Sequence, residues 1–159
     1  MNGLAFRRAV EDDIPALMRI RLAVNENRLS DPTRVTHAMC SDYLDRLGRG
    51  WVAELAGEIV GFSYAARDGS IWALFVAPQR EGLGAGRRLL RLAVDWLFEI
   101  GHHELHLGTQ ANTRADRFYA AQGWTREGMK NDVEVGYRLR RELVRAPTNA
   151  PATGTGAGA

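Results

Sequence analysis

The sequence predicts one α/β domain of the α+β type, in which a mixed, mostly antiparallel sheet carries helices on both faces in the order βααβββαβαββ. Three observations lead to this fold class. The chain has 159 residues and is 45% hydrophobic, which suits a single core. Three short apolar runs follow one another without a helix between them, which is not a doubly wound pattern. One strand then crosses a glycine-rich turn into an amphipathic helix.

The first half of the chain supplies a strand, two helices and three further strands. Asp12 or Asp13 can cap the first helix, and Gly48 and Gly50 are expected to stop the second. A polar stretch over residues 25–32 separates the two helices. The elements expected, in order, are a strand over 4–10, a helix over 14–24, a helix over 36–47, and strands over 51–55, 58–65 and 70–76.

The second half alternates helices and strands and ends in a tail. Its expected elements are a helix over 84–100, a strand over 104–108, a helix over 112–122, and strands over 124–127 and 133–139. From Ala146 the chain has no charged, aromatic or large aliphatic residue. We therefore expect a domain over residues 1–145 and a disordered tail over 146–159, because such a tail cannot offset its ordering entropy.

The stretch from Leu74 to Leu90 is the most informative part of the sequence. Glycines at 82, 84 and 86 leave the helix start bare of side chains, so several backbone N–H groups point at whatever occupies the turn. Four arginines, at 80, 87, 88 and 91, stand at this positive end of the helix, where carboxylates would be the stabilising residues. The pattern indicates a phosphate site, and a solvated arginine face with an ordinary turn is the alternative.

Two familiar phosphate motifs do not fit this turn. A P-loop needs Lys followed by Ser or Thr after its last glycine, but Arg87 and Arg88 stand there. A dinucleotide fingerprint read from Gly82 or Gly84 would place its third glycine at Arg87 or Leu89.

The turn resembles the signature of the GNAT superfamily of acetyl-CoA-dependent N-acetyltransferases, Q/R-x-x-G-x-G/A. In that register Gly84 and Gly86 are the signature glycines. Glu81 stands where the family has Gln or Arg, so the backbone cradle is kept and the side chain's help to the pyrophosphate is lost.

A second segment, residues 105–124, carries the same resemblance. The family follows its fifth strand with an asparagine that opens a helix, a tyrosine two turns later, and then glycine with an aromatic residue. Asn112, Tyr119, Gly123 and Trp124 stand at these positions. Seven residues are nearly two helical turns, so Asn112 and Tyr119 are expected on one helix face.

The resemblance implies that acetyl-CoA is the acetyl donor, that no metal is needed, and that the fourth and fifth strands splay apart around the pantetheine. The cofactor-binding residues implied are Leu74, Phe75, Val76, Glu81, Gly82, Leu83, Gly84, Ala85, Gly86, Arg87, Arg88, Asn112 and Tyr119.

The implied reaction is direct attack of a neutral amine on the thioester through a tetrahedral intermediate. A backbone N–H near Leu74 or Phe75 would polarise the carbonyl, and Tyr119 would protonate the departing sulfur. Glu134 is the first candidate for the general base, and Glu26 is the second. We place Glu26 and Trp72 at the acceptor site, although Trp72 can equally belong to the core.

Composition bounds the remaining possibilities. Twenty-one basic against 19 acidic residues give a net charge of +2, which does not demand nucleic acid. The single cysteine, Cys40, excludes an internal disulfide and fits a reducing cytosol, and we expect neither a signal peptide nor a membrane span, so a cytoplasmic protein. His102, His103 and His106 with Glu104 lack the spacing of a zinc motif.

Two other classes of function stay open. One is a module that senses acyl-CoA without turnover, and the other is an arginine surface that binds RNA or DNA. The acceptor is a small-molecule or protein amine that the sequence does not identify, and a homodimer is left open.

Overall fold

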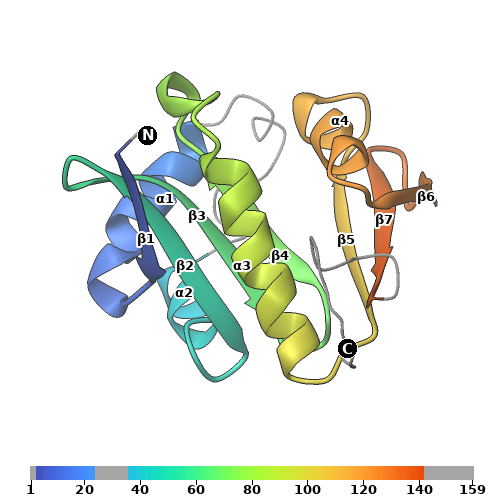
Figure 1. Cartoon of the computed structure of the whole chain (residues 1–159), viewed down its shortest axis with the longest axis horizontal. Coiled ribbons are helices and arrows are strands. Elements are labelled where there is room, and N and C mark those ends of the chain that lie inside the picture. The colour runs from blue at the N-terminus through green and yellow to red at the C-terminus, as the bar shows by residue number, and fades with distance from the viewer. Residues whose placement is uncertain (1–2, 24–35, 142–159) are drawn as a thin grey trace, which may run out of the picture.

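The computed structural model describes residues 3–23 and 36–141, which form two antiparallel sheets with helices packed on them (Figure 1). The strands are β1 (Leu4–Arg8), β2 (Gly48–Leu55), β3 (Glu58–Ala66), β4 (Ile71–Val76), β5 (Glu104–Gln110), β6 (Thr125–Met129) and β7 (Glu134–Arg140). The helices are α1 (Ile14–Ala23), α2 (His37–Asp42), α3 (Ala85–Glu99) and α4 (Arg114–Ala121), with 3₁₀ turns at Glu11–Asp13 and Pro78–Arg80. The predicted element order is confirmed.

The sheet is split between its fourth and fifth strands. One sheet has the order β1-β2-β3-β4 and the other β5-β7-β6, and all pairings within them are antiparallel. A single parallel bridge, Ser70 with His106, joins the two in the described residues, and the His106 N–H donates to the Gly69 carbonyl at 3.1 Å. Beyond this bridge β4 and β5 separate, so the expected splay is present and the sheet is mixed only at this bridge.

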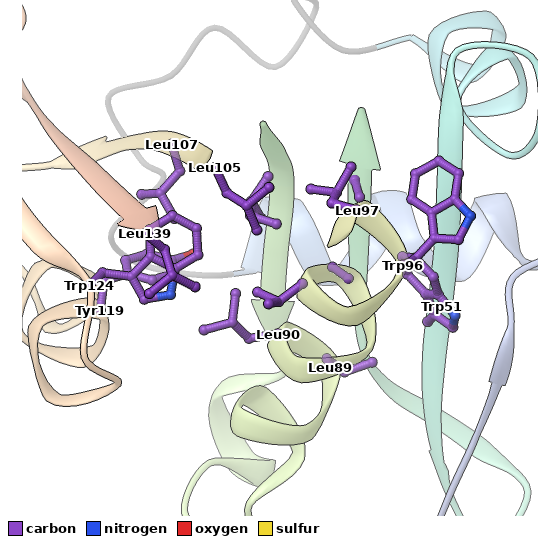
Figure 2. Packing of buried hydrophobic residues seen from close by; sticks show 14 of the residues in the cluster. Trp51, Leu89, Leu90, Trp96, Leu97, Leu105, Leu107, Tyr119, Trp124 and Leu139 are labelled. Atoms are coloured by element: carbon purple, nitrogen blue, oxygen red, sulfur yellow. The ribbon is translucent and has the colours of Figure 1, made fainter. Parts of the chain in front are cut away.

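Alternation along the strands divides the core between two faces of the first sheet. Trp51 and Ala53 of β2 face α3, whereas Val52 between them packs with α1. Leu89 and Leu97 are fully buried on the apolar side of α3. Figure 2 shows this side of α3 between the first sheet and the leucines, tyrosine and tryptophan of the second half.

The sequence predicts a second helix over residues 36–47, but α2 ends at Asp42 and the two glycines expected to stop it lie inside β2. Both allow the strand to approach its neighbours closely. A Cβ added to Gly48 would stand 2.0 Å from the Ala65 carbonyl oxygen, and one added to Gly50 would stand 2.7 Å from the Tyr64 ring. These glycines serve strand packing and not a helix end.

Several expectations lie outside the described residues. They are the polar stretch over 25–32 with Glu26, the domain boundary at 145, and the tail over 146–159. Trp51 and Trp96 are buried core residues whose ring centroids lie 6.0 Å apart. No helix in the two described ranges is both long enough and apolar enough to cross a membrane.

Candidate active site

A cleft of about 1080 Å³ lies where β4 and β5 separate. Residues of β4, α1 and α2 form one wall, and residues of β5, α4 and the β6–β7 connection form the other. The turn that leads into α3 also borders the cleft. The split between the sheets therefore places the glycine turn, the exposed edge of β4 and helix α4 around one space.

The turn has the conformation that its glycines suggest. Gly82 and Gly84 have φ angles of +89° and +87°, and Gly84 is the N-cap of α3 without any side chain to cap the first N–H groups. L-residues with a side chain rarely adopt this left-handed region. The bare helix start is therefore built into the backbone, and its N–H groups are available to an anion.

The space above the turn suits a phosphate ligand. A Cβ added to Gly82 or Gly84 would have no protein atom within 4 Å, and one added to Gly86 would meet Val76 at an ordinary 3.6 Å. Protein packing alone thus does not require Gly86, whereas a ligand lying close to the backbone would. The Nε atom of Arg80 is buried at the cleft and has no hydrogen-bond partner among the residues that the structure describes. The residues present therefore fit the anionic part of coenzyme A.

The four arginines near the turn do not form one open basic patch. Arg80 pairs with Glu58 at 3.5 Å, and Arg91 pairs with Asp95 at 3.0 Å. Arg88 lies over the Phe6 ring, 5.3 Å from its centroid, in a neighbouring groove. Arg87 borders both that groove and the cleft. Among these four, Arg80 and Arg87 are the ones placed to meet a ligand in the cleft.

Glu81 and Leu83 differ from the rest of the turn. The Glu81 carboxylate binds Arg114, the first residue of α4, at 2.7 Å, so this ion pair connects two elements that border the cleft. Leu83 lines the groove beside Arg88 and is not part of the cleft lining.

The edge of β4 lies along the cleft. Leu74 pairs with Ser63 on the β3 side, whereas the other edge of β4 faces the gap toward β5. Leu74, Phe75 and Val76 all border the cleft. Backbone groups on an open strand edge can bind an extended ligand as a further strand would.

Tyr119 reaches the cleft from α4 and is 6% exposed. Its ring contacts Phe118, Trp124 and Tyr137, with centroids 5.3, 6.1 and 5.9 Å away. Burial raises the pKa of the Tyr119 phenol. A phenol in this state keeps its proton at neutral pH, so it can donate a proton but cannot serve as a base.

Glu134 and Trp72 also border the cleft. Glu134 begins β7, and its backbone N–H donates to the Asn131 side chain at 2.8 Å. Trp72 stacks on Tyr43 with centroids 4.3 Å apart and packs against Tyr64. Trp72 therefore belongs to the core on one side and to the cleft on the other, which joins the two possibilities left open by the sequence.

Asn112 is not where the helix pattern puts it. Thr113 is the N-cap of α4, and Asn112 precedes it with a φ of +63°, so Asn112 and Tyr119 share no helix face. The Asn112 N–H donates to the Asp116 carboxylate at 2.8 Å. Asn112 is also absent from the residues that border the cleft. Its visible role is to shape the chain before α4.

The residue that organises this region is Asp116, which the sequence analysis does not identify. Its buried carboxylate also accepts hydrogen bonds from Arg126, at 3.1 and 3.0 Å, and from the Tyr137 hydroxyl. Arg126, above all, lowers the pKa of the Asp116 carboxyl. The signal that could have revealed it is Thr113-x-x-Asp116, a capping pattern.

The ring of His102, just before β5, has a backbone partner. A ring nitrogen of His102 lies 2.7 Å from the Arg67 carbonyl oxygen. Within residues 3–23 and 36–141, no three His, Cys, Asp or Glu side chains are grouped so as to hold a metal ion.

Known proteins match both the sequence and the fold. Residues 14–124 match the model of the Acetyltransferase (GNAT) family. Mycothiol acetyltransferase of Sanguibacter keddieii is 32% identical over an alignment 123 positions long, which covers 66% of this chain and 39% of that protein. This chain thus spans about two fifths of the length of that relative.

Two solved structures share the fold at low identity. A GCN5-related N-acetyltransferase of Rhodopseudomonas palustris has a TM-score of 0.73 at 19% identity, over 88% of this chain and 97% of that one. The PaiA N-acetyltransferase of Thermoplasma acidophilum, solved with coenzyme A, has a TM-score of 0.74 at 13% identity, over 86% of this chain and 98% of that one. The family match covers the glycine turn, helix α3 and Tyr119. On this match, the chain belongs to the GNAT family of acetyltransferases.

Proposed function

We propose that the chain is an N-acetyltransferase that moves an acetyl group from acetyl-CoA to a primary amine. One observation carries this proposal: a single cleft joins a bare helix start, an open strand edge, the buried Tyr119 phenol and the Glu134 carboxylate. The relatives support it, because one is named a mycothiol acetyltransferase and another was solved with coenzyme A.

Donor binding would use the backbone first. The N–H groups of residues 82–87 would hold the pyrophosphate, helped by Arg87 and by the buried Nε of Arg80. The edge of β4 from Leu74 to Val76 would bind the pantetheine amides. Glu81 would not help, since it brings a negative charge to an anion site.

The transfer step needs a base, a carbonyl stabiliser and an acid. Glu134, directly or through a water, would take the proton of the incoming ammonium, whose nitrogen then forms the new bond to the acetyl carbon. A backbone N–H near Leu74 or Phe75 would stabilise the oxyanion of the tetrahedral intermediate. As the carbon–sulfur bond breaks, the electron pair goes to sulfur, which would take its proton from Tyr119. The nitrogen of the new amide would then give up its remaining extra proton, directly or through water, to the Tyr119 phenolate.

The first test is the release of free thiol from acetyl-CoA with a panel of amines that includes polyamines, aminoglycosides, amino acids and peptides. We expect thiol release with at least one of them, together with the acetylated amine. Tight binding of acetyl-CoA without turnover on any amine would favour a sensor of acyl-CoA and refute the transferase proposal.

Tyr119→Phe tests the acid role, because it keeps the ring and removes the proton. We expect single-turnover kcat to fall at least about tenfold while the acetyl-CoA dissociation constant stays nearly unchanged. Tyr64→Phe is the matched control, since Tyr64 is also buried but lies outside the cleft and donates its hydroxyl to the Cys40 carbonyl. Equal kcat for wild type and Tyr119→Phe would leave solvent as the proton donor.

A further inference from the structure

Apart from the charged residues near the glycine turn and Arg114, the cleft lining carries charges of opposite sign on its two walls. Arg21, near the end of α1, borders the cleft on the side of the first sheet. Glu134 begins β7 and Asp132 lies just before it, and both border the cleft on the side of the second sheet. The cleft of the proposed enzyme therefore presents the Arg21 cation on one wall and these two carboxylates on the other.

Arg21 is not an ordinary surface arginine. Its exposed fraction is 8%, which makes it one of the four buried polar or charged residues of the described ranges. Leu17, one turn earlier on α1, is fully buried and also borders the cleft. The positive charge of Arg21 acts on Cys40 of α2. Burial raises the pKa of the Cys40 thiol, and the Arg21 charge partly opposes that rise.

A buried guanidinium can serve more than one partner. Arg21 has interactions within the chain, and its side chain has five N–H donors in a planar fork that fits a carboxylate. Keeping such a group nine-tenths buried is costly unless opposite charge and hydrogen bonds compensate it. A carboxylate in the cleft would add to that compensation.

Apolar side chains make up much of the same region. They include Leu17 and Met18 of α1, Met39 of α2, Phe62 of β3 and Trp72 of β4. An acceptor with an apolar body would bury surface against them, at roughly 25 cal/mol for each Å².

We infer that the acceptor is an amine that also bears a carboxylate and an apolar group, as in an apolar amino acid, and that Arg21 binds the carboxylate while the amine faces Glu134. This inference rests on the proposed transferase function and adds a substrate class to it. Arg21 is then a specificity residue, because it contacts the acceptor without contacting the reacting atoms.

The test compares L-leucine with L-leucinamide as acceptors, since the two differ only in the charged carboxylate. The quantity measured is the ratio of kcat/KM for leucine to that for leucinamide, in wild type and in Arg21→Gln. Dividing one ratio by the other cancels the different basicity of the two amines. We expect this quotient to be about tenfold or more, the loss typical of a charge-assisted hydrogen bond.

Arg19→Gln is the control, because Arg19 lies on the same helix but is exposed and does not border the cleft. It should leave the ratio unchanged. A wild-type measurement covers the case in which Arg21→Gln does not fold: 4-methylpentanoate, which has leucine's carboxylate and no amine, should compete with leucine and not with acetyl-CoA.

The outcomes separate this inference from the proposed function. Three results would each overturn the role of Arg21. The first is thiol release in which the preference for leucine over leucinamide is the same in wild type and in Arg21→Gln. The others are a best acceptor that has no carboxylate, and the absence of competition by 4-methylpentanoate. If none of the amines supported thiol release, the transferase function itself would be refuted.

Discussion

Asp116 connects the helix that carries Tyr119 to the second sheet, and replacing it with asparagine tests that connection. Asp116 lies in α4, Arg126 in β6 and Tyr137 in β7, while Asn112 precedes the helix. Asp116→Asn keeps the shape of the side chain but removes its charge. It also replaces one acceptor oxygen with an NH₂ group that cannot accept a hydrogen bond.

The loss of stability follows from these contacts. A hydrogen bond to a charged group contributes about 1.5–3 kcal/mol, and a buried donor left without an acceptor costs about 1–3 kcal/mol. The ion pair itself adds little, about 0–1 kcal/mol, because the Arg126 side chain is 45% exposed. We expect Asp116→Asn to lose about 2–3 kcal/mol, which lowers Tm by about 4–12 °C at this chain length.

The effect should depend on pH in a defined direction. The folded state lowers the pKa of Asp116 from its ordinary 3.8, so the carboxylate stabilises the fold fully above that value and loses this effect as the pH falls below it. The difference in unfolding free energy between wild type and Asp116→Asn should therefore be constant from about pH 6 to 8 and narrow below about pH 5.

Denaturant unfolding at several pH values measures this difference, with Asp95→Asn as the control. Asp95 pairs with Arg91 on the surface of α3 and is 57% exposed, so its replacement should cost no more than about 0.5 kcal/mol. A difference for Asp116→Asn as small as that of Asp95→Asn, or one that does not change down to pH 3, would refute this reasoning.

Two further predictions concern the turn before α3. Gly84→Val should weaken acetyl-CoA binding at least about tenfold, measured by isothermal titration, because the new side chain fills the phosphate cradle. Gly101→Val is the control, since Gly101 also has a positive φ, +113°, but lies outside the cleft. It should share the backbone strain of about 1–3 kcal/mol and keep the affinity. Glu81→Gln should raise acetyl-CoA affinity by about two- to fivefold at low salt and less at high salt, because it removes a negative charge near the phosphates. The control Glu58→Gln should change this affinity less. Unchanged affinity in Glu81→Gln would place the phosphates elsewhere.

Local sequence signals determined the element order and the position of the turn. Period-2 alternation identifies the strands, and the 3.6-residue period identifies α3, because these patterns arise within each element. The glycines at 82 and 84 likewise indicate left-handed backbone, because this preference belongs to the residue itself. The family resemblance added the splay of the strands, and the divergence of β4 from β5 confirms it.

A distant contact decides the conformation at one misplaced element. Gly48 and Gly50 look like a helix stop, but their role comes from Ala65 and Tyr64 on the next strand, which local propensity cannot register. The second misplaced element was open to a local signal. Asn112 looks like the start of a helix, yet Thr113 caps α4 and the Asp116 carboxylate holds the Asn112 backbone, as the Thr113-x-x-Asp116 pattern could have indicated.

The charges of the cleft were decided by tertiary structure alone. In the sequence, the arginines near the turn form one cluster, and only the fold pairs Arg80 with Glu58, 22 residues away. In the same way, Arg21 is one of 21 basic residues until α1 packs beside β4 and buries it at the cleft wall. The sequence by itself thus determined what each segment becomes, because backbone conformation depends on near neighbours. The meeting of charges depends on how segments pack, and so only the tertiary structure decided which side chains surround the cleft.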